Sequence, residues 1–468
     1  MTIAITIFRV FLVSIVLSAS SMTAAQDRQF SIKQYEDGSI YEGTFENGLP
    51  HGNGTYRFPN GYTYTGNWIE GQIQGSGTAR FPNGSIYEGN FVDGKPAGTG
   101  MITYADGIIY EGDWKEGVIE GSGIMIYPNG VQYKGTFRDG KPNGKGTLIG
   151  LDGYSYDGDW SDGVQQGEGT FIFTDGSAYQ GQVVDGKPEG TGTLTESNGS
   201  SLRGVWQGGK VVGQATFSYA NGDIYEGELA DGQRTGRGFM TYANGDIYEG
   251  EFRADRRHGQ GTLRGVDGFV YVGDWVDGRM EGIGRTEYPD GSIYEGEYRA
   301  NLADGKGKIT YADGSVYDGD WIAGKINGTG RVVHVNGFVY EGQFRDGSRH
   351  GQGVLIQDDT YRYDGQWQDG EKHGLGRSFY PDGTAYTGEF IRGRRSGKGL
   401  IEMTSGFRYD GDWSEGEITG TGIATYADGS SYEGLFKNGK RHGKGVMHFP
   451  SGQILRGIWK EGRFEARQ

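Results

Sequence analysis

Three sets of side chains in this chain could do chemistry, and each recurs at a fixed spacing. One repeated position is held by His51, His258, His350, His373 and His442. Acidic pairs also recur, such as Asp318 with Asp320 and Asp410 with Asp412. Two residues that are two apart on a strand share a face, so each pair resembles a general acid-base dyad. Aromatic rings form the third set, and all nine tryptophans hold one repeated position.

The spacing argues against catalysis and against a metal centre. His350 and His373 are one repeat apart, which is roughly 10 Å in a β-ribbon, whereas a Zn–N bond is about 2 Å. We therefore interpret the histidines as loop-filling residues. A catalytic site is normally unique, but the acidic pairs recur, so we expect them to face solvent. The chain has no cysteine, hence no thiol nucleophile and no disulfide. The sequence predicts no enzyme activity, no cofactor and no metal. Calcium bound by the Asp-Gly turns stays open as an alternative.

The whole chain is built on a repeat of 23 residues. The phrase at 317–324 (Tyr-Asp-Gly-Asp-Trp-Ile-Ala-Gly) returns from position 41 to position 455 over 18 periods without insertion or deletion. A period of 20–50 residues is the signature of a repeat array. Glycine makes up 92 of 468 residues, but it keeps a fixed frame, so the chain is not a flexible linker.

Each repeat predicts a β-hairpin. Residues 294–298 (Tyr-Glu-Gly-Glu-Tyr) alternate aromatic and polar, which is typical of a strand with one aromatic face, and the glycine leaves space for a ring over the backbone. A loop such as 437–443 follows, then a second strand such as 307–311, and then the turn 312–314 (Ala-Asp-Gly). We expect an all-β, elongated, single-layer antiparallel meander of about 18 hairpins, twisted or curved, whose single layer cannot bury every ring.

The repeat resembles the MORN (membrane occupation and recognition nexus) family. That family's pattern is Y-E-G-x-[WF] followed by spaced glycines and a D-G or N-G turn, and 87–91 and 432–436 are similar to it. The resemblance covers about nine-tenths of the chain and implies a meander of hairpins in a bacterial-type exported array. It implies less about function, because MORN repeats serve varied proteins.

Residues 1–25 differ from the array. A basic residue, a short apolar run and small residues follow in order, which is typical of a secretory signal peptide, and we predict cleavage after Ala25. The protein is then exported, either periplasmic or secreted. The alternative is an uncleaved N-terminal membrane anchor.

Repeat counting predicts the domain boundaries. We expect an N-terminal cap and half repeat at 26–40, repeats 1–8 at 41–224, repeat 9 at 225–247, repeats 10–18 at 248–454 and a terminal half repeat at 455–468. Tryptophan recurs in every second repeat, but the phase slips between Trp206 and Trp275, so 225–247 is a candidate hinge. The first strand of the terminal half repeat lacks a partner in this scheme, which predicts an open edge and a homodimer through it.

Two surfaces are candidate binding sites. An aromatic groove is predicted at Trp68, Trp114, Trp160, Trp206, Trp275, Trp321, Trp367, Trp413 and Trp459. Loops that could meet an anionic surface are predicted at Arg256, Arg257, Arg349, Arg394, Arg395, Lys440 and Arg441. Residues 251–468 have a net charge of −3 and residues 1–250 a net charge of −13, so only the later half suits anionic lipid, and nucleic acid is excluded as a partner. We predict a non-enzymatic scaffold for a protein partner or an envelope surface, with a glycan- or anionic-lipid-binding ribbon as the alternative.

Overall fold

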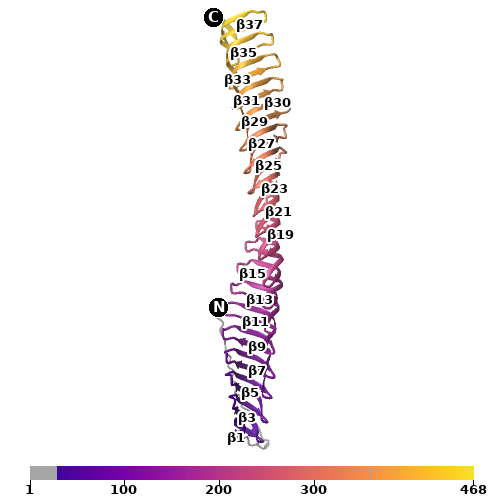
Figure 1. The fold of residues 1–468 in the computed structure, drawn as a ribbon, viewed down its shortest axis with the longest axis vertical. Coiled ribbons are helices and arrows are strands. Elements are labelled where there is room, and N and C mark those ends of the chain that lie inside the picture. The colour runs from indigo at the N-terminus through magenta and orange to yellow at the C-terminus, as the bar shows by residue number, and fades with distance from the viewer. Residues whose placement is uncertain (1–28, 359, 468) are drawn as a thin grey trace, which may run out of the picture. The chain divides into compact units, whose positions relative to one another are not determined.

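The computed structural model describes residues 29–358 and 360–467, and in these residues the chain is all-β. These residues form 39 antiparallel strands and no helix. They therefore contain no helix that is long and apolar enough to cross a membrane. The chain divides between Ser197 and Asn198 into two compact units. Within each unit every strand pairs with the strands next to it in the chain, which confirms the predicted open antiparallel meander (Figure 1). The predicted signal peptide and Ala25 lie outside the described residues.

Unit 1 holds the first fifteen strands. They are β1 (Gln29–Gln34), β2 (Ile40–Glu46), β3 (Leu49–Arg57), β4 (Thr63–Ile69), β5 (Gln72–Arg80), β6 (Ile86–Val92), β7 (Lys95–Thr103), β8 (Ile109–Lys115), β9 (Val118–Ile126), β10 (Gln132–Arg138), β11 (Lys141–Ile149), β12 (Ser155–Ser161), β13 (Val164–Ile172), β14 (Ala178–Val184) and β15 (Lys187–Thr195).

Unit 2 holds the remaining strands. They are β16 (Ser201–Gln207), β17 (Lys210–Ser218), β18 (Ile224–Ala230), β19 (Gln233–Thr241), β20 (Ile247–Arg253), β21 (Arg256–Arg264), β22 (Val270–Val276), β23 (Arg279–Glu287), β24 (Ile293–Arg299), β25 (Leu302–Thr310), β26 (Val316–Ile322), β27 (Lys325–Val333), β28 (Val339–Arg345), β29 (Ser348–Gln357), β30 (Tyr361–Gln368), β31 (Glu371–Phe379), β32 (Ala385–Ile391), β33 (Arg394–Glu402), β34 (Arg408–Ser414), β35 (Glu417–Thr425), β36 (Ser431–Lys437), β37 (Lys440–His448), β38 (Ile454–Lys460) and β39 (Arg463–Arg467).

The loop predicted inside each hairpin is a turn of only two residues. Between β36 and β37 it consists of Asn438 and Gly439, with φ values of 47° and 74°. Two central residues with positive φ define the turn that best fits the right-handed twist of a hairpin. The prediction of a loop over 437–443 was therefore wrong, because the second strand starts directly after this turn. The connection to the next repeat matches the prediction, since Gly314 has a φ of 85° and its N–H donates to Tyr311 O at 3.0 Å or less.

Most hairpins have a register shift beside a pair of facing glycines. In the hairpin of β26 and β27, Gly319 lies opposite Gly330, and the register shifts between Gly319 and Trp321. Such a β-bulge bends the strand and increases its twist. The ring of Tyr317 lies over both glycines, because a Cβ on Gly330 would be 2.5 Å from Tyr317 Oη. This confirms the prediction that the glycine leaves space for a ring, and it identifies the ring as that of the tyrosine two residues earlier.

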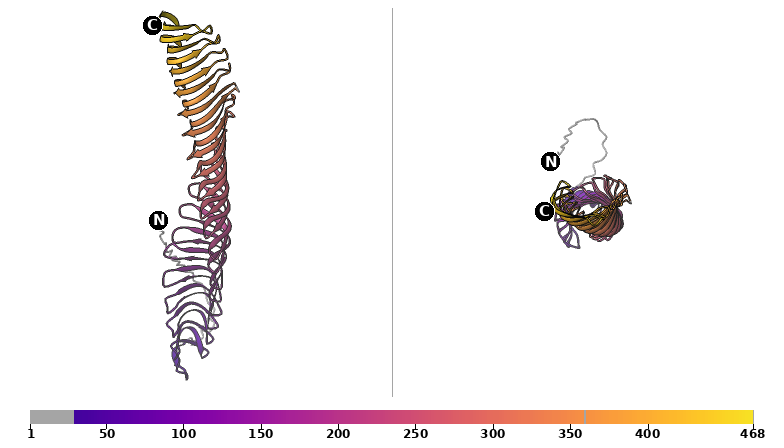
Figure 2. Two further views of the ribbon diagram at one scale, coloured as in Figure 1. Left: turned by 45° about the horizontal axis from the view of Figure 1, so that its top comes forward. Right: turned by 90° about the horizontal axis from the view of Figure 1, so that it is seen from above.

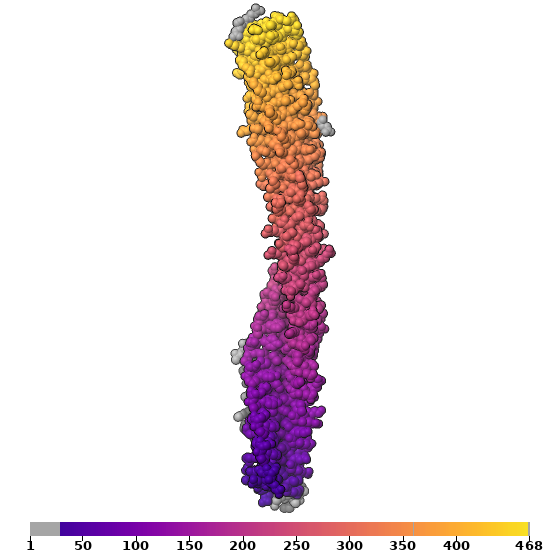
Figure 3. All heavy atoms as spheres, viewed as in Figure 1, coloured from indigo at the N-terminus to yellow at the C-terminus, as the bar shows by residue number. Residues whose placement is uncertain are grey.

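The single layer buries its rings better than the sequence predicted. Tyr317 and the opening tyrosines of nearly all other repeats have 0–1% of their surface exposed, and Trp321 has 7%. The strands of each unit are curved (Figure 2), and the ring of Tyr317 is covered by Trp321 of its own repeat and by Phe344 of the next repeat. Neighbouring repeats of each unit are in close contact in the space-filling view (Figure 3). The expectation that one layer cannot bury every ring holds outside these positions, since Tyr311 is 38% exposed and Phe30 is 63% exposed.

The ends of the array show one confirmation and one correction. β1 pairs with β2 from Gln29↔Phe45 to Gln34↔Ile40, as expected of a cap strand. At the other end β38 does have a second strand, because Trp459 pairs with Phe464 of the short strand β39. The predicted unpartnered first strand was wrong, since two residues at 461–462 suffice to turn the chain back. The hinge at 225–247 stays a prediction.

Candidate functional site

Within each unit the aromatic rings form a ladder along most of the sheet, interrupted where Val183, Leu202 or Leu229 takes the place of a ring, and we call it the aromatic ladder. Tyr87 contacts Phe91 of its own repeat and Trp114 of the next repeat, with ring centroids 5.0 Å apart and interplanar angles of 86° and 81°. Trp114 then contacts Tyr110 at 5.6 Å. Edge-to-face pairs contribute about 0.5–1.5 kcal/mol each beyond the area that they bury. The ladder therefore joins each repeat to the next.

The predicted groove tryptophans are members of this ladder. Each of the nine has only 2–7% of its surface exposed. Seven of them donate the indole N–H to the carbonyl of a glycine fourteen residues earlier: Trp68, Trp114, Trp160, Trp275, Trp321, Trp367 and Trp413. A hollow of about 420 Å³ lies beside Trp114. Because the indoles serve as core, little of their surface is open to a ligand, and ligand binding by them stays a prediction.

The ladder tyrosines are held in their neutral form. Burial raises the pKa of Tyr64 and Tyr87 to about 12. Each phenol donates to a main-chain carbonyl three residues later, as Tyr87 does to Asn90 O at 3.0 Å. These hydroxyl groups are used in the fold, so they are not available as acids or nucleophiles near neutral pH.

Four of the predicted surface cations belong to the core instead. Arg257, Arg349, Arg395 and Arg441 lie over the rings of Trp275, Trp367, Trp413 and Trp459, 4.2–4.4 Å from the centroids. Arg349 also donates from Nη2 to Gly370 O at 2.7 Å, and burial lowers its pKa. A cation over an aromatic ring contributes about 0.5–2 kcal/mol. These half-buried guanidinium groups fasten one repeat to the next.

The other three cations are exposed and begin strands. Arg256, Arg394 and Lys440 are the first residues of β21, β33 and β37. The prediction that they lie in loops was wrong, because the second strand of each hairpin starts directly after a two-residue turn. Arg394 pairs with Glu415 at 2.6 Å, and Lys440 pairs with Glu461 at 3.3 Å. Their charges are therefore partly neutralised within the sheet.

The histidines also lie in strands rather than in loops. His51 Nε2 is 2.9 Å from Glu46 Oε2, while His258 and His350 are 3.9 and 3.8 Å from Asp277 and Asp369. No group of three or more histidine, aspartate or glutamate side chains in residues 29–358 and 360–467 is arranged to hold a metal ion.

The acidic pairs have unequal environments. Asp320 accepts hydrogen bonds from Thr329 N and Thr329 Oγ1, both at 2.8 Å, and forms an ion pair with Lys306. These partners, Lys306 first, lower the pKa of its carboxyl group. The bulge leaves the Thr329 N–H without a main-chain acceptor, and the carboxylate replaces it. Asp320 is therefore a structural acceptor, and the prediction that both members of the pair simply face solvent was wrong for it.

Sequence reasoning missed this acceptor position, although the repeat contained its signal. The same bond is made by Asp113, Asp159, Glu251, Asp274, Glu297, Gln343, Gln366, Glu389 and Asp412. Only Asp, Glu and Gln make it in this set, and all three carry an oxygen acceptor on a short stem. The recurrence of acceptors one residue before the buried ring could have indicated it.

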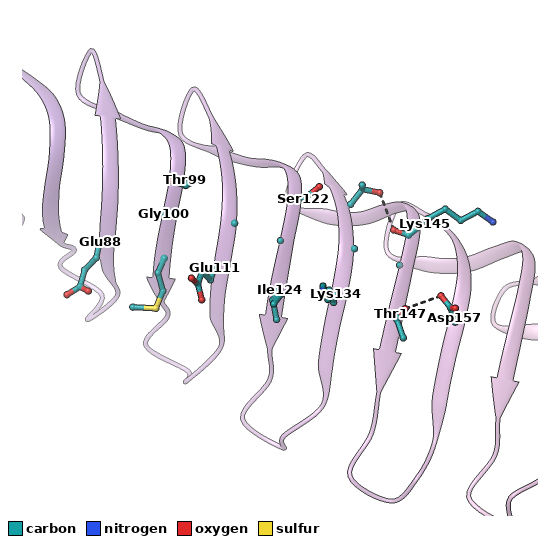
Figure 4. A pocket seen from close by; sticks show the side chains of 16 residues that line it. Glu88, Thr99, Gly100, Glu111, Ser122, Ile124, Lys134, Lys145, Thr147 and Asp157 are labelled. Carbon is teal, nitrogen blue, oxygen red and sulfur yellow. Dashed lines mark hydrogen bonds between the residues drawn. The ribbon is translucent and has the colours of Figure 1, made fainter. Parts of the chain in front are cut away.

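The sheet face opposite the ladder, which we call the open face, is hollowed in unit 1. The unit 1 trough extends from β6 to β12 and has a volume of about 950 Å³. Gly100 and Gly112 contribute main chain to its floor, and a Cβ on either would point to the ladder face, against Tyr87 or Tyr110. Glu88, Glu111 and Lys134 project from one row along it (Figure 4).

Unit 2 has a similar hollow on its own open face. The unit 2 trough extends from β25 to β30 and has a volume of about 940 Å³, with Asp318, Arg331 and Glu341 along it. A smaller hollow of about 510 Å³ is lined by Arg237, Phe239 and Glu249, among others. The open face of each unit is thus polar, accessible and shaped by the repeat.

Comparison with protein families identifies the repeat. The MORN repeat family model matches residues 41–61, 64–86, 87–109, 110–132, 133–153, 156–178, 179–201, 203–224, 225–247, 248–270, 271–293, 294–316, 317–338, 340–359, 363–385, 386–407, 409–431 and 432–454. The chain belongs to the MORN repeat family, which confirms the resemblance. Membership indicates a repeat scaffold for interaction with proteins or membranes.

Comparison with individual proteins adds little. No curated protein matches the chain. Among solved structures, the chain is similar to the TCP10 domain of Danio rerio CPAP, at 15% identity over 42% of this chain and 93% of that one, with a TM-score of 0.26. It is also similar to the SAS-4 TCP domain of Drosophila melanogaster in complex with a proline-rich motif of Ana2, at 15% identity over 46% and 99% of the two chains, with a TM-score of 0.19. The overlap is low in both, so nothing about this chain is inferred from them.

Proposed function

We propose that the chain is a non-enzymatic scaffold that binds a protein partner on its open face. The observation that carries this proposal is the unequal use of the two faces. The aromatic ladder is consumed as core, since Tyr87 and Tyr110 are fully buried and Trp114 is 7% exposed. The opposite face keeps a trough in each unit, and a hollow with convergent polar groups is the default binding surface.

A protein partner has more support than an anionic membrane. The arginines over Trp275 and Trp413 are half-buried, and exposed Arg394 is paired with Glu415. Of the seven cations predicted to meet an anionic surface, four lie half-buried over tryptophan rings and two are in ion pairs, so most of this set is not free for lipid headgroups, whose attraction needs clusters of free Lys and Arg. Export to a periplasm or to the medium, as the first 25 residues suggest, belongs to the proposal too.

Site-specific photo-crosslinking tests the proposal. A photoreactive residue replaces Ser122 in the unit 1 trough, Gln352 in the unit 2 trough, or Val266, which is 70% exposed at a turn. In cells that produce the chain, we expect a defined protein adduct from a trough position and none from Val266. Adducts from Val266 alone would refute open-face binding. Sedimentation of the purified chain with anionic vesicles or with cell-wall glycans, without any adduct, would favour the alternative instead.

A further inference from the structure

The charges of the two troughs are arranged differently at equivalent positions. On the open face, residues that face one another on successive strands form a row across the sheet. Along this row, acidic residues alternate with the residues that face them on the next strand. In unit 2, Lys308 lies between Glu295 and Asp318, and Arg331 lies between Asp318 and Glu341. Arg331 Nε is 3.9 Å from Glu341 Oε2. The acids of the unit 2 trough therefore have cations of the same sheet beside them.

In unit 1 the corresponding cations are replaced by aliphatic side chains. Met101 lies between Glu88 and Glu111, and Ile124 lies between Glu111 and Lys134. Glu88 and Glu111 are exposed, and within the described residues no cation lies at ion-pair distance from either of them. The two carboxylates thus flank an apolar floor, and their charge is not matched by the sheet.

The rest of the unit 1 trough supplies its own partners. Asp157 accepts a hydrogen bond from Thr147 Oγ1 at 3.0 Å (Figure 4), and Lys145 pairs with Asp159 at 2.8 Å. The unmatched acids are therefore Glu88 of β6 and Glu111 of β8, on either side of Met101, while Lys134 of β10 has no ion pair either within the described residues. Apolar surface next to unpaired acids is complementary to a ligand with apolar and basic groups side by side.

We propose that the unit 1 trough is the docking site for a basic, amphipathic polypeptide segment of the partner. Its apolar side chains cover Met101 and Ile124, and its lysines or arginines pair with Glu88 and Glu111. Seven strands at about 4.8 Å spacing give the trough a length of roughly 29 Å. That length accommodates a helix of about 20 residues. This inference rests on the proposed open-face binding and specifies its ligand chemistry.

The absence of cysteine makes a local binding assay straightforward. Ser122→Cys labelled with an environment-sensitive dye reports on the unit 1 trough, and Gln352→Cys reports on the unit 2 trough. The probes are three 20-residue peptides that carry leucine with lysine, leucine with glutamate, or serine with lysine. We expect the leucine–lysine peptide to change the dye signal at residue 122, and the other two to bind at least about ten-fold more weakly.

Matched acid substitutions test whether the site is local. Glu88→Gln with Glu111→Gln is expected to weaken the leucine–lysine peptide by about ten-fold, as the loss of two exposed ion pairs predicts. Asp318→Asn with Glu341→Gln removes the same charge from the unit 2 trough and should change affinity at residue 122 by less than about two-fold. If the two double substitutions weakened the leucine–lysine peptide equally, the peptide would be attracted to the acidic chain in general, and the proposal would be overturned.

Transplanting the pattern tests sufficiency. Lys308→Met with Arg331→Ile gives the unit 2 trough the aliphatic residues of unit 1, and both positions are on the open face, so the ladder is left intact. The variant should gain leucine–lysine binding reported at residue 352, and failure to gain it would contradict the proposal. If no peptide binds but Ser122 still crosslinks a protein, the ligand chemistry is wrong while open-face binding stands. If peptides bind but no crosslink forms at either trough, open-face binding of a protein partner is refuted.

Discussion

Adding one methyl group beneath a ladder tyrosine should be costly. Gly330→Ala places a Cβ 2.5 Å from Tyr317 Oη and Cε2 and 2.6 Å from Cζ, whereas packed carbon atoms stay about 3.5–4.0 Å apart. Gly330 does not adopt the left-handed region, so the substitution adds no backbone strain. Without the clash, alanine would stabilise a strand by roughly 0.5–1 kcal/mol.

The structure sets limits on this cost. If the backbone yields, overpacking costs about 1–3 kcal/mol. If the ring of Tyr317 is expelled, the lost burial of 150–250 Å² costs roughly 4–6 kcal/mol at about 25 cal/mol per Å². Tyr317 is fully buried between Trp321 and Phe344, so it has no free space to move into. We expect a loss of about 2–4 kcal/mol.

Gly347→Ala is the matched control. Gly347 has a φ of 83°, but no heavy atom lies within 4 Å of a Cβ built on it. This change therefore adds backbone strain of about 1–2 kcal/mol without a clash. Repeat arrays can unfold in parts, so local stability is measured by hydrogen exchange on fragments covering 317–333, together with urea unfolding. A cost for Gly330→Ala no larger than that of Gly347→Ala would refute the packing of the ring on the glycine pair.

Three side-chain changes and two titrations test the remaining parts of the fold. The core tyrosines with a pKa raised to about 12 stay protonated when folded, so stability falls as pH rises above about 10, and the phenolate absorbance at 295 nm should appear only with unfolding. Arg395→Ala should cost about 1–2 kcal/mol in urea unfolding because it lies over Trp413, whereas Arg394→Ala should cost less than about 0.5. Asp320→Ala leaves the Thr329 N–H without its acceptor and should cost about 1–3 kcal/mol. The lowered pKa of Asp320 means that this stabilisation is present above about pH 4 and is lost as pH falls further, so the difference in stability between the variant and the parent should shrink as the pH falls. Deleting 455–468 should lower the solution mass if the chain pairs through its C-terminal edge, and an unchanged mass would exclude that contact.

The sequence predicted the hairpins because their signals are local. The spacing of Tyr317, Gly319 and Trp321 within one strand, and the turn residues at 312–314, specify two strands and their aromatic face without knowledge of any distant contact. The exact recurrence every 23 residues then extends one hairpin to the whole array. Fold class and repeat identity were predictable for this reason.

Contacts that depend on the bulge were not predictable from periodicity. The register shift at Gly388 places Arg395 opposite Phe390 and over Trp413 of the next repeat, so a residue interpreted as a loop cation becomes part of the core. The corresponding shift of the next hairpin, between Gly411 and Trp413, accompanies the use of Asp412 as the acceptor for Thr421 N–H, so this residue is not simply half of an acidic pair. Pairing registers must be known before these roles can be assigned.

Size compensation is a further feature that a single repeat does not reveal. Ala79 and Ala424 take the place of a larger inward residue, and the residue seventeen positions earlier is then Tyr62 or Phe407. Tyr361 and Ser378 follow the same rule, and their hydroxyl oxygens are 3.3 Å apart. Overpacking is costly in a close-packed core, so in these three repeats a small residue at one position accompanies a large residue at the other.

Quenching of tryptophan fluorescence by iodide tests the central claim most directly. All nine tryptophans hold the same ladder position, so one measurement reports on the aromatic face of both units. If this face is core, emission is blue-shifted and iodide quenches it several-fold less than in the urea-unfolded chain. Quenching as strong as in the unfolded chain would mean that the indoles line an open groove, and it would contradict the assignment of binding to the opposite face.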